Sequence, residues 1–340
     1  MNLCSSPIVK PLLTNPILLF VNPASGGGLG LELMSILSDV KNLFIVQLPA
    51  EQDTWYLKYS NIVNNPNLRA VVAGGDGSVN WVVKMLSTVY NENEFRPPLA
   101  VIPFGTGNDM SRNLGWGGGI SKSALLQVGR TIENMANSDR IETIDVWTVA
   151  VQLKDKEEIN KYQMINYISF GVDGNIARDY EIFRRATQPL LCCQCMSQAL
   201  FVPAGAVNFF GKRSVGEYMS IDLVNLDGHE GPTKLKTLSG EKTIMFLSSK
   251  TVYAGKTLWR GKPAQMDDGK LEVVMQGGVW AITFSNIGIN LTRSVGQTEA
   301  ARIETSEPTY YQIDGEAMNV NGPATFDIVR TGSYPFLHAQ

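Results

Sequence analysis

Apolar residues along the first third of the chain alternate between short continuous runs and helical spacing. Continuous runs of strand length occupy residues 17–21, 43–48, 68–73 and 99–103. Helical spacing is found over residues 29–40, 54–63 and 78–90, and in a short helix that ends at residue 114. Runs buried on both faces that alternate with helices predict a parallel sheet covered by helices on both sides. We therefore expect an N-terminal, doubly wound, Rossmann-like α/β domain.

The pattern changes after about residue 140, where strands follow one another with few helices between them. Expected strands cover residues 144–153, 164–171, 217–224, 243–247, 271–275 and 324–329. Helices are expected over residues 175–187 and 197–210, and polar loops over residues 91–94 and 154–160. This pattern predicts a mainly antiparallel β-sandwich as the second domain. The expected domains are residues 1–142, completed by 325–340, and residues 143–324, with the active site in the cleft.

Composition narrows the class of protein without identifying it. The 340 residues are 44% hydrophobic and 18% charged, as in an ordinary globular protein. The net charge of −3 gives no basic footprint, so nucleic acid is not expected as a partner. The N-terminus has neither the pattern of a signal peptide nor that of a membrane span, which favours a cytoplasmic protein whose membrane contacts are peripheral. The four cysteines are expected to be reduced thiols.

Histidine is too scarce for several common kinds of active site. The chain has only His229 and His338, and they stand far apart in the sequence. A catalytic triad or a multi-histidine metal site would need one of these isolated residues. Any acid–base chemistry is therefore expected to depend on carboxylates.

Three glycine-rich turns follow three of the expected parallel strands. Ligands bind beyond the carboxyl ends of such strands, where glycine allows close backbone approach and helix N-termini attract anions. Three turns at one edge predict a cradle for the phosphates of a nucleotide. The expected nucleotide contacts are Asn22, Pro23, Ala24, Ser25, Gly26, Gly74, Gly75, Asp76, Gly77, Ser78, Asn80, Gly105, Thr106, Gly107, Asn108 and Asp109.

Asp76 is the unusual member of this set, because a carboxylate repels phosphate unless a cation lies between them. Magnesium is the expected cation, since it is commonly bound by one or two carboxylates together with phosphate oxygens. Asp109 is either a second ligand or a helix cap, and the sequence leaves both open. Residues 254–257 resemble the end of a P-loop, but Lys250 stands where its first glycine is required. No Gly-x-Gly-x-x-Gly motif is present either, which weakens the assignment to a dinucleotide-binding domain or a protein kinase.

The motifs together resemble a known family. The stretches 21–27, 74–81 and 103–119 are similar to the catalytic domain of eukaryotic-type diacylglycerol kinases, and the last includes Gly115-Trp116-Gly117-Gly118-Gly119. The stretches 166–174, 268–273 and 312–316 are similar to the accessory domain of the same family. The resemblance follows the chain in order from about residue 17 to its end. Animal members carry cysteine-rich lipid-binding modules, which this chain lacks.

The resemblance implies that the chain phosphorylates the hydroxyl of diacylglycerol with ATP and Mg²⁺, giving phosphatidic acid. Asp76 would organise the magnesium, and Glu316, with Asp314 beside it, would accept the proton of the hydroxyl. On sequence alone, however, a hairpin turn is the preferred interpretation of Asp-Gly-Glu, and only the resemblance favours the catalytic role. Asp268 precedes a strand as a turn residue, while the resemblance also implies a structural metal there. The metal ligands expected on these grounds are Asp76, Asp109 and Asp268.

Several further expectations follow from the resemblance and from the charge pattern. Arg112, Lys256 and Arg260 are candidates to offset phosphate charge. The apolar stretch 189–210 is either a lipid-facing patch for diacylglycerol-containing membranes or a buried helix. Alternative functions are a sphingoid-base, ceramide or NAD kinase, or a non-catalytic nucleotide-binding regulator. The oligomeric state stays open, with a homodimer as one arrangement.

Overall fold

The computed structural model describes residues 13–92, 94–187, 203–205, 213–235, 240–279, 281 and 289–339. The chain divides into two compact units, Met1–Glu142 with Pro335–Gln340, and Thr143–Tyr334. The segment 325–340, expected to complete the N-terminal domain, is thus shared, and joins the first unit only from Pro335. The four cysteines, most of the expected helix 197–210 and most of the apolar stretch 189–210 lie outside the described residues.

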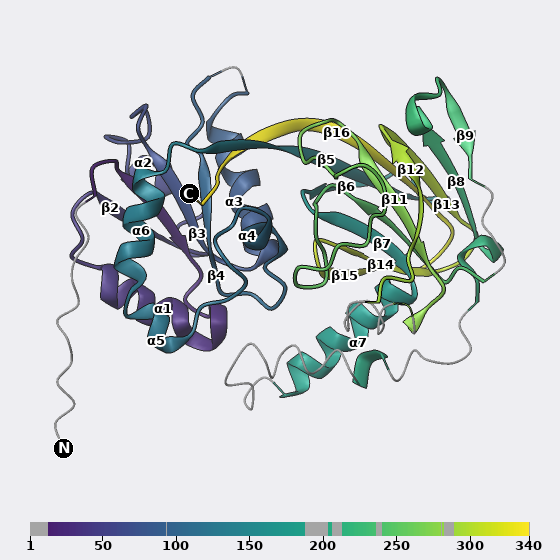
Figure 1. The fold of residues 1–340 in the computed structure, drawn as a ribbon, viewed down its shortest axis with the longest axis horizontal. Helices are drawn as coiled ribbons and strands as arrows, with labels where there is room; N and C mark the ends of the chain where they lie inside the picture. The colour runs from purple at the N-terminus through teal and green to yellow at the C-terminus, as the bar shows by residue number, and fades with distance from the viewer. Residues whose placement is uncertain are drawn as a thin grey trace. The chain divides into compact units, whose positions relative to one another are not determined.

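The first unit contains a parallel sheet in the strand order β2-β1-β3-β4, extended by the end of β16 (Figure 1). Its strands are β1 (Ile17–Val21), β2 (Leu43–Gln47), β3 (Arg69–Gly74) and β4 (Leu99–Pro103). Its helices are α1 (Ser25–Leu37), α2 (Trp55–Lys58), α3 (Asp76–Val89), α4 (Asp109–Asn113), α5 (Lys122–Leu125) and α6 (Val128–Asn137). The strand order reverses between β1 and β3, which is the switch point at which open sheets bind ligands.

Both faces of this sheet are buried, as the continuous apolar runs predict. Ile17, Leu19 and Val21 share one hydrophobic cluster with residues of α1, α5 and α6. Leu18 and Phe20 alternate with them and are fully buried as well, and the ring of Phe20 packs edge-on against Trp55 at 5.5 Å. The doubly wound α/β prediction is confirmed for this unit.

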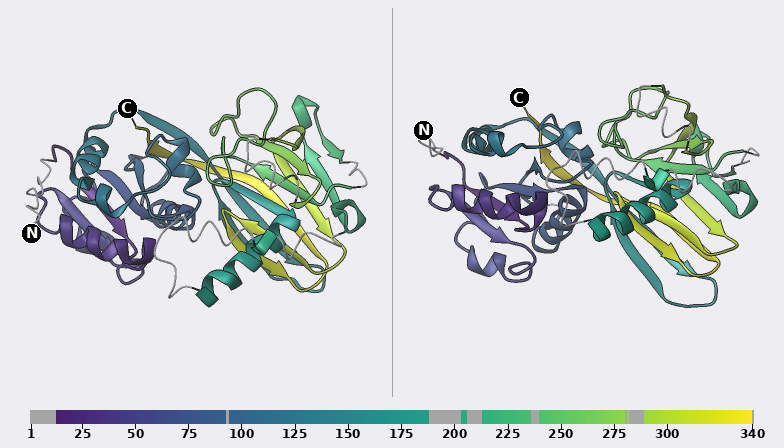
Figure 2. Two further views of the ribbon diagram at one scale, coloured as in Figure 1. Left: turned by 60° about the horizontal axis from the view of Figure 1, so that its bottom comes forward. Right: turned by 90° about the horizontal axis from the view of Figure 1, so that it is seen from below.

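The second unit is built from two sheets (Figure 2). One contains β5 (Ile141–Leu153), β6 (Ile159–Met164), β8 (Met219–Val224), β9 (Pro232–Lys234), β13 (Ala300–Thr305) and β16 (Ala324–Leu337). The other has the order β12-β11-β10-β7-β14-β15, with bounds β7 (Tyr167–Gly171), β10 (Thr243–Leu247), β11 (Leu271–Gln276), β12 (Arg293–Thr298), β14 (Thr309–Ile313) and β15 (Glu316–Val320). Helix α7 (Val172–Thr187) follows β7, and two short 3₁₀ turns, η2 (Val215–Glu217) and η3 (Leu226–Gly228), flank β8.

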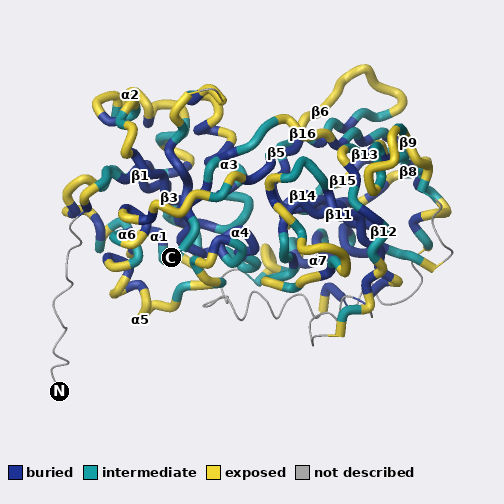
Figure 3. The backbone as a smooth tube through the Cα atoms, turned by 45° about the horizontal axis from the view of Figure 1, so that its top comes forward, coloured by how far each residue is buried: buried dark blue, intermediate teal, exposed yellow. Residues whose placement is uncertain are grey.

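One hydrophobic core lies between the two sheets of this unit, and Figure 3 shows buried strands in both units. Phe170 of β7 packs at its centre, stacked on Tyr311 at 6.0 Å and edge-on to Phe326 at 5.0 Å. All pairings within the six-stranded sheet are antiparallel. The expected antiparallel β-sandwich is therefore confirmed.

Local boundaries differ from the sequence prediction in several places. The expected strand 164–171 is two strands, because β6 ends at Met164 and β7 begins at Tyr167. The expected helix 54–63 is regular only over α2. The expected loop 154–160 gives way to β6 at Ile159, and the last strand extends to Leu337. Strands β12 to β15 were not predicted, because their apolar residues are interspersed with charged and small ones.

Candidate functional site

The three glycine turns follow β1, β3 and β4, which are neighbours in the sheet. These strands are parallel, so their carboxyl ends meet at one edge of the first unit. The sequence-predicted nucleotide contacts therefore fall on three adjacent loops.

The turn after β1 is tightened by its own backbone. Asn22 accepts hydrogen bonds from Ala24 N at 3.0 Å through its side chain and from Ser25 N at 2.9 Å through its carbonyl. The next three glycines, Gly26, Gly27 and Gly28, have φ of 64°, 69° and 97°. A left-handed run of this kind is accessible at low cost only to glycine. Right-handed helix therefore begins only beyond Gly28, as expected from the apolar spacing.

The other two turns touch each other through their glycines. A side-chain carbon on Gly105 would lie 2.4 Å from Cα of Gly75, and one on Gly75 would lie 2.9 Å from Cα of Gly105. Phe104 N also donates to Gly74 O at 3.0 Å. The two loops can approach this closely only because neither residue has a side chain.

Asp76 links these two loops by its carboxylate. It stands at the start of α3, yet it accepts hydrogen bonds from the backbone N–H of Asp109 at 3.1 Å and of Met110 at 3.0 Å, at the start of α4. Burial raises the pKa of Asp76, and the backbone donors oppose that shift. The position of this carboxylate is thus fixed by two helix starts.

Asp109 brings a second carboxylate to the same point. A side-chain carbon on Gly107 would lie 3.4 Å from Oδ2 of both Asp76 and Asp109. Asp109 is only 4% exposed, so two acidic side chains converge beside a glycine of the third turn. Two carboxylates of this kind fit the usual protein share of a magnesium site, which phosphate oxygens and water complete. Within the described residues, no group of three or more His, Cys, Asp or Glu side chains is arranged to hold a metal on its own.

Asn108 and Arg112 hold the third turn in shape. Asn108 is 1% exposed and left-handed (φ 54°), and its amide bonds both the N–H and the carbonyl of Gly105, at 2.8 Å each. Arg112 donates to the carbonyls of Gly107 at 3.2 Å and Gly118 at 3.3 Å. Its guanidinium occupies the space that a side chain on Gly118 would fill. Arg112, expected to offset phosphate charge, is therefore engaged with loop carbonyls.

The glycine-rich tail of the third motif binds the end of the chain. Trp116 Nε1 donates to Leu337 O at 2.7 Å, and Ala339 N donates to Leu114 O at 2.8 Å. Gly115 is left-handed (φ 77°) and lies against His338 and Ala339. In this structure the tail joins the third turn to the C-terminal segment, a role that its sequence alone does not indicate.

In the second unit, Asp314 and Gly315 form the two-residue turn between β14 and β15. Both have left-handed φ, 49° and 88°, as a tight hairpin turn requires. Asp314 is buried, and its carboxylate accepts hydrogen bonds from three consecutive backbone N–H groups. Their donors are Ile165 at 3.0 Å, Asn166 at 2.8 Å and Tyr167 at 3.0 Å. The hairpin interpretation is thus correct, and Asp314 fastens the hairpin to the start of β7.

Glu316 is the other acidic residue of the motif, and it is exposed on β15. Its side chain lies close enough to the protein for partial desolvation to raise its pKa. Glu181 of α7 adds to this shift, and Arg184 opposes it. A solvent-accessible carboxylate with a raised pKa has the properties of a general base.

Asp268 lies in the turn before β11, where it accepts from Lys270 N at 3.1 Å. The neighbouring Asp145 accepts from Gly269 N at 2.7 Å and pairs with Arg330 at 2.6 Å. Burial raises the pKa of Asp268, Lys270 opposes the shift, and Asp145 and Asp267 add to it. A metal at Asp268 stays a prediction.

Asp173 is a buried acidic residue to which the sequence assigned no role. It lies in the first turn of α7 and accepts hydrogen bonds from side chains of Ser169, Tyr253 and Gln312. The signal available in the sequence was its place within the motif 166–174, but no spacing indicated its partners. Of the two cations expected in this unit, Lys256 closes a short loop by backbone bonds to Val252, and Arg260 is exposed.

Comparison with known proteins places both units in one family. The profile of the diacylglycerol kinase catalytic domain matches residues 16–141, and that of the diacylglycerol kinase accessory domain matches residues 163–317. The chain is 28% identical over 341 residues to the eye-specific diacylglycerol kinase of Drosophila melanogaster, covering 94% of this chain and 22% of that protein. It is 29% identical over 343 residues to diacylglycerol kinase 1 of Arabidopsis thaliana, covering 95% of this chain and 44% of that protein.

The chain therefore spans less than half the length of these curated relatives. Its fold is similar to that of a diacylglycerol kinase from Bacillus anthracis strain Sterne, with a TM-score of 0.59 at 18% identity, over 95% of this chain and 97% of that one. Among the described helices, none is both long and apolar enough to cross a membrane.

Proposed function

We propose that this chain, which belongs to the diacylglycerol kinase family, transfers the terminal phosphate of ATP to the hydroxyl of diacylglycerol. The observation that supports this most directly is the convergence of Asp76 and Asp109 on Gly107, among three glycine turns of one sheet edge. Two acidic side chains beside bound phosphates favour a cation between them, and Mg²⁺ bound to nucleotide phosphates would provide it.

In the proposed mechanism, the turns after β1, β3 and β4 hold the nucleotide by their backbone N–H groups. Asp76 and Asp109 would hold Mg²⁺, which would neutralise negative charge on the phosphates while the terminal phosphoryl group is transferred. The hydroxyl oxygen attacks the terminal phosphorus, the bond from phosphorus to the bridging oxygen breaks, and ADP leaves. Glu316 accepts the hydroxyl proton as the new bond forms.

The two acidic residues of the hairpin are assigned different roles in this proposal. Asp314 already accepts three backbone hydrogen bonds, and protonating it would remove acceptor capacity from groups that need it. Glu316 is exposed, and desolvation raises its pKa. These properties support Glu316 as the proton acceptor and Asp314 as the residue that shapes the hairpin. The proposed acceptor is a membrane lipid, so the chain must contact a membrane to reach it. We propose that this contact is peripheral.

The proposal is tested by offering labelled ATP and Mg²⁺ with each of four acceptors. Diacylglycerol, sphingosine and ceramide are supplied in mixed micelles, and NAD is supplied in solution. Label is expected in phosphatidic acid, and its formation should stop when Mg²⁺ is chelated. Transfer to another acceptor with none to diacylglycerol would replace the substrate. Nucleotide binding without transfer to any of them would favour the non-catalytic regulator.

A further inference from the structure

The buried carboxylate of Asp173 connects several elements of the second unit by hydrogen bonds. It is 3% exposed, and its carboxylate accepts from Ser169 Oγ of β7, from Tyr253 OH at 2.7 Å, and from Gln312 Nε2 of β14. Burial raises the pKa of Asp173, and the three donors oppose that shift. Three donors from three different elements thus converge on one acidic side chain at the start of α7.

The bond to Gln312 bears on the position of Glu316. Gln312 pairs with Ser169 of β7 on one side and with Ala317 of β15 on the other. Among the described strands β15 is the last in its sheet, so within that sheet Glu316 is held through β14. The next register pair beyond Gln312–Ala317 is Ile313–Glu316. Asp173 therefore anchors β14 one register pair before Glu316.

The bond to Tyr253 holds a strained loop. Tyr253, Ala254 and Gly255 have φ of 53°, 61° and 97°, and the loop is closed by reciprocal backbone bonds between Val252 and Lys256, at 2.9 and 2.6 Å. A left-handed conformation is unfavourable for a residue with a side chain, so two such residues need compensating contacts. The Tyr253 hydroxyl on Asp173 provides one, and the Tyr253 ring packs edge-on to Tyr167 at 6.4 Å.

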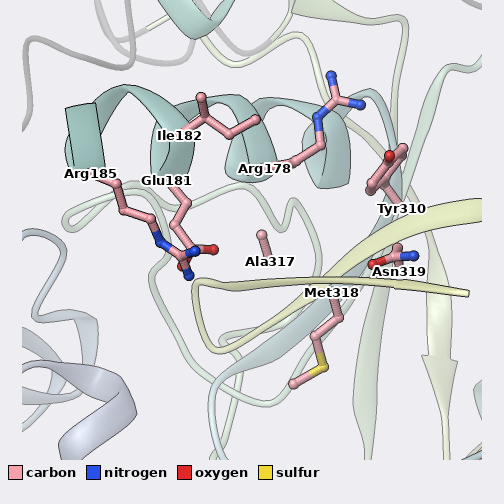
Figure 4. Close-up of a pocket in the computed structure, with 8 residues that line it drawn as sticks. All are labelled: Arg178, Glu181, Ile182, Arg185, Tyr310, Ala317, Met318 and Asn319. Carbon is pink, nitrogen blue, oxygen red and sulfur yellow. The ribbon is translucent and has the colours of Figure 1, made fainter.

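Helix α7, which has Asp173 in its first turn, faces the same hairpin (Figure 4). Arg178 lies over the ring of Tyr310 at 4.4 Å, and Glu181 raises the pKa of Glu316. Residues of α7 and of the hairpin line a pocket of about 200 Å³. Any shift of the first turn of α7 would thus change the electrostatic surroundings of Glu316.

We propose that Asp173 is a positioning residue for phosphoryl transfer, which ties the Glu316 hairpin and the loop 252–256 to the start of α7. The inference rests on the proposed function, in which Glu316 accepts the proton. Asparagine in place of Asp173 would keep the size of the side chain. Its amide, however, has a single acceptor oxygen, so at least one of the three groups that donate to the carboxylate would lose its acceptor.

A double-mutant cycle separates positioning from a merely structural contribution. Asp173→Asn is expected to lower kcat for diacylglycerol by about 10- to 100-fold with KM for MgATP unchanged, because misplacing a catalytic group affects only the transition state. In a Glu316→Gln background the same substitution should cause no further loss, since residues that act through one another are not additive. Loss by the same factor in both backgrounds would overturn the proposal.

The remaining arms make the result unambiguous. Gln312→Met removes the hydrogen bond from Gln312 to Asp173. It is measured in the same double-mutant cycle with Glu316→Gln, in case Asp173→Asn fails to fold. Asp222→Asn, on β8 and outside this cluster, is the matched control and should leave kcat unchanged. If Glu316→Gln is slow but Asp173→Asn and Gln312→Met keep wild-type kcat, only the positioning role is wrong. If Glu316→Gln itself keeps wild-type kcat, the base assignment fails and this inference fails with it.

Discussion

The two units treat their paired acidic residues in opposite ways. In the first unit, Asp76 and Asp109 are 33 positions apart, yet a carboxylate oxygen of each lies 3.4 Å from the same point above Gly107. In the second, Asp314 and Glu316 are nearly adjacent in sequence, yet one is buried among backbone donors and the other is exposed. Proximity in sequence is therefore a poor guide to which carboxylates act together.

Hydrogen bonds to the backbone do not separate the two cases, since Asp76 and Asp314 both accept them. What differs is the charge around each carboxylate. The three backbone donors to Asp314 stabilise its negative charge. Burial raises the pKa of Asp76 although backbone donors oppose the shift, and the carboxylate of Asp109 converges with it on Gly107. The proposed Mg²⁺ is therefore assigned to the converging pair Asp76 and Asp109, and not to Asp314.

The largest expected effect comes from removing one member of the converging pair. Asp76→Asn should lower turnover by about 1000-fold or more, because the variant loses half of the charge that would hold Mg²⁺ against the phosphates. Asp76 accepts through both carboxylate oxygens, so the single amide oxygen can keep only one of the two bonds from the start of α4. We therefore expect the variant to fold with a lowered melting temperature. Initial rates at saturating MgATP, with melting curves alongside, measure both. Asp155→Asn, at an exposed turn, is the matched control.

That prediction fails if Asp76→Asn keeps more than about a tenth of wild-type turnover while folding normally. The convergence of Asp76 and Asp109 in the first unit would then have no role in catalysis.

The second prediction concerns the exposed member of the hairpin. Glu316→Gln should lower kcat by about 100- to 1000-fold without loss of ATP binding. A general base acts when ionised, and desolvation, helped by Glu181, raises the pKa of Glu316 above its ordinary 4.5. Wild-type kcat should therefore fall as the pH drops through a value above 4.5, and the residual rate of the variant should lack that acid limb. The pH profile of kcat tests this assignment, with Glu157→Gln as an exposed control. If Glu316→Gln keeps the acid limb of the wild type, that limb belongs to another group.

Strands and turns of the first unit could be predicted because their causes are local. Continuous apolar runs such as 17–21 and 99–103 specify strands buried on both faces, and glycine specifies the turns between Gly26 and Gly28. Strands β12 to β15 have no such signature, because their pairing partners and not their own pattern stabilise them.

Roles of single residues depended on contacts that no local pattern records. Asp314 is fixed by backbone groups 147 to 149 positions away, so its structural role is invisible beside Glu316 in the sequence. Arg112 lies across Gly118 because that residue has no side chain, and this placement engages its guanidinium with loop carbonyls. Long-range packing, and not residue type, decided these assignments.

A smaller effect should distinguish the buried member of the hairpin from its neighbour. Asp314→Asn should lower the free energy of unfolding by about 2–3 kcal/mol, because the amide offers one acceptor oxygen where the carboxylate offers two. Below the melting temperature, its kcat should remain well above that of Glu316→Gln. Urea unfolding and initial rates measure the two quantities. If kcat falls as far as in Glu316→Gln with stability unchanged, Asp314 is the proton acceptor and the roles in the hairpin are reversed.

The smallest expected effect tests whether a raised pKa by itself marks function. Glu272 of β11 is fully buried; its Oε1 accepts from Gln297 at 3.1 Å, and within the described part of the chain its Oε2 has no hydrogen-bond partner. Burial raises the pKa of Glu272 to about 7. Between the ordinary value of 4.5 and about 7, the folded protein holds a proton that the unfolded chain releases, so stability should fall as the pH rises through this window and stay level above it.

Glu272→Gln removes that ionisation while keeping the oxygen that binds Gln297. The variant should match the wild type near pH 4.5 and exceed its free energy of unfolding by about 1–3 kcal/mol at pH 8, measured by urea unfolding at both values. Its kcat and the acid limb of its pH profile should be those of the wild type. The ionisation of Glu272 is expected to change the free energy of unfolding, whereas that of Glu316 is expected to change kcat. A shifted acid limb in this variant would mean that burial alone, far from the hairpin, sets the pH dependence ascribed to Glu316.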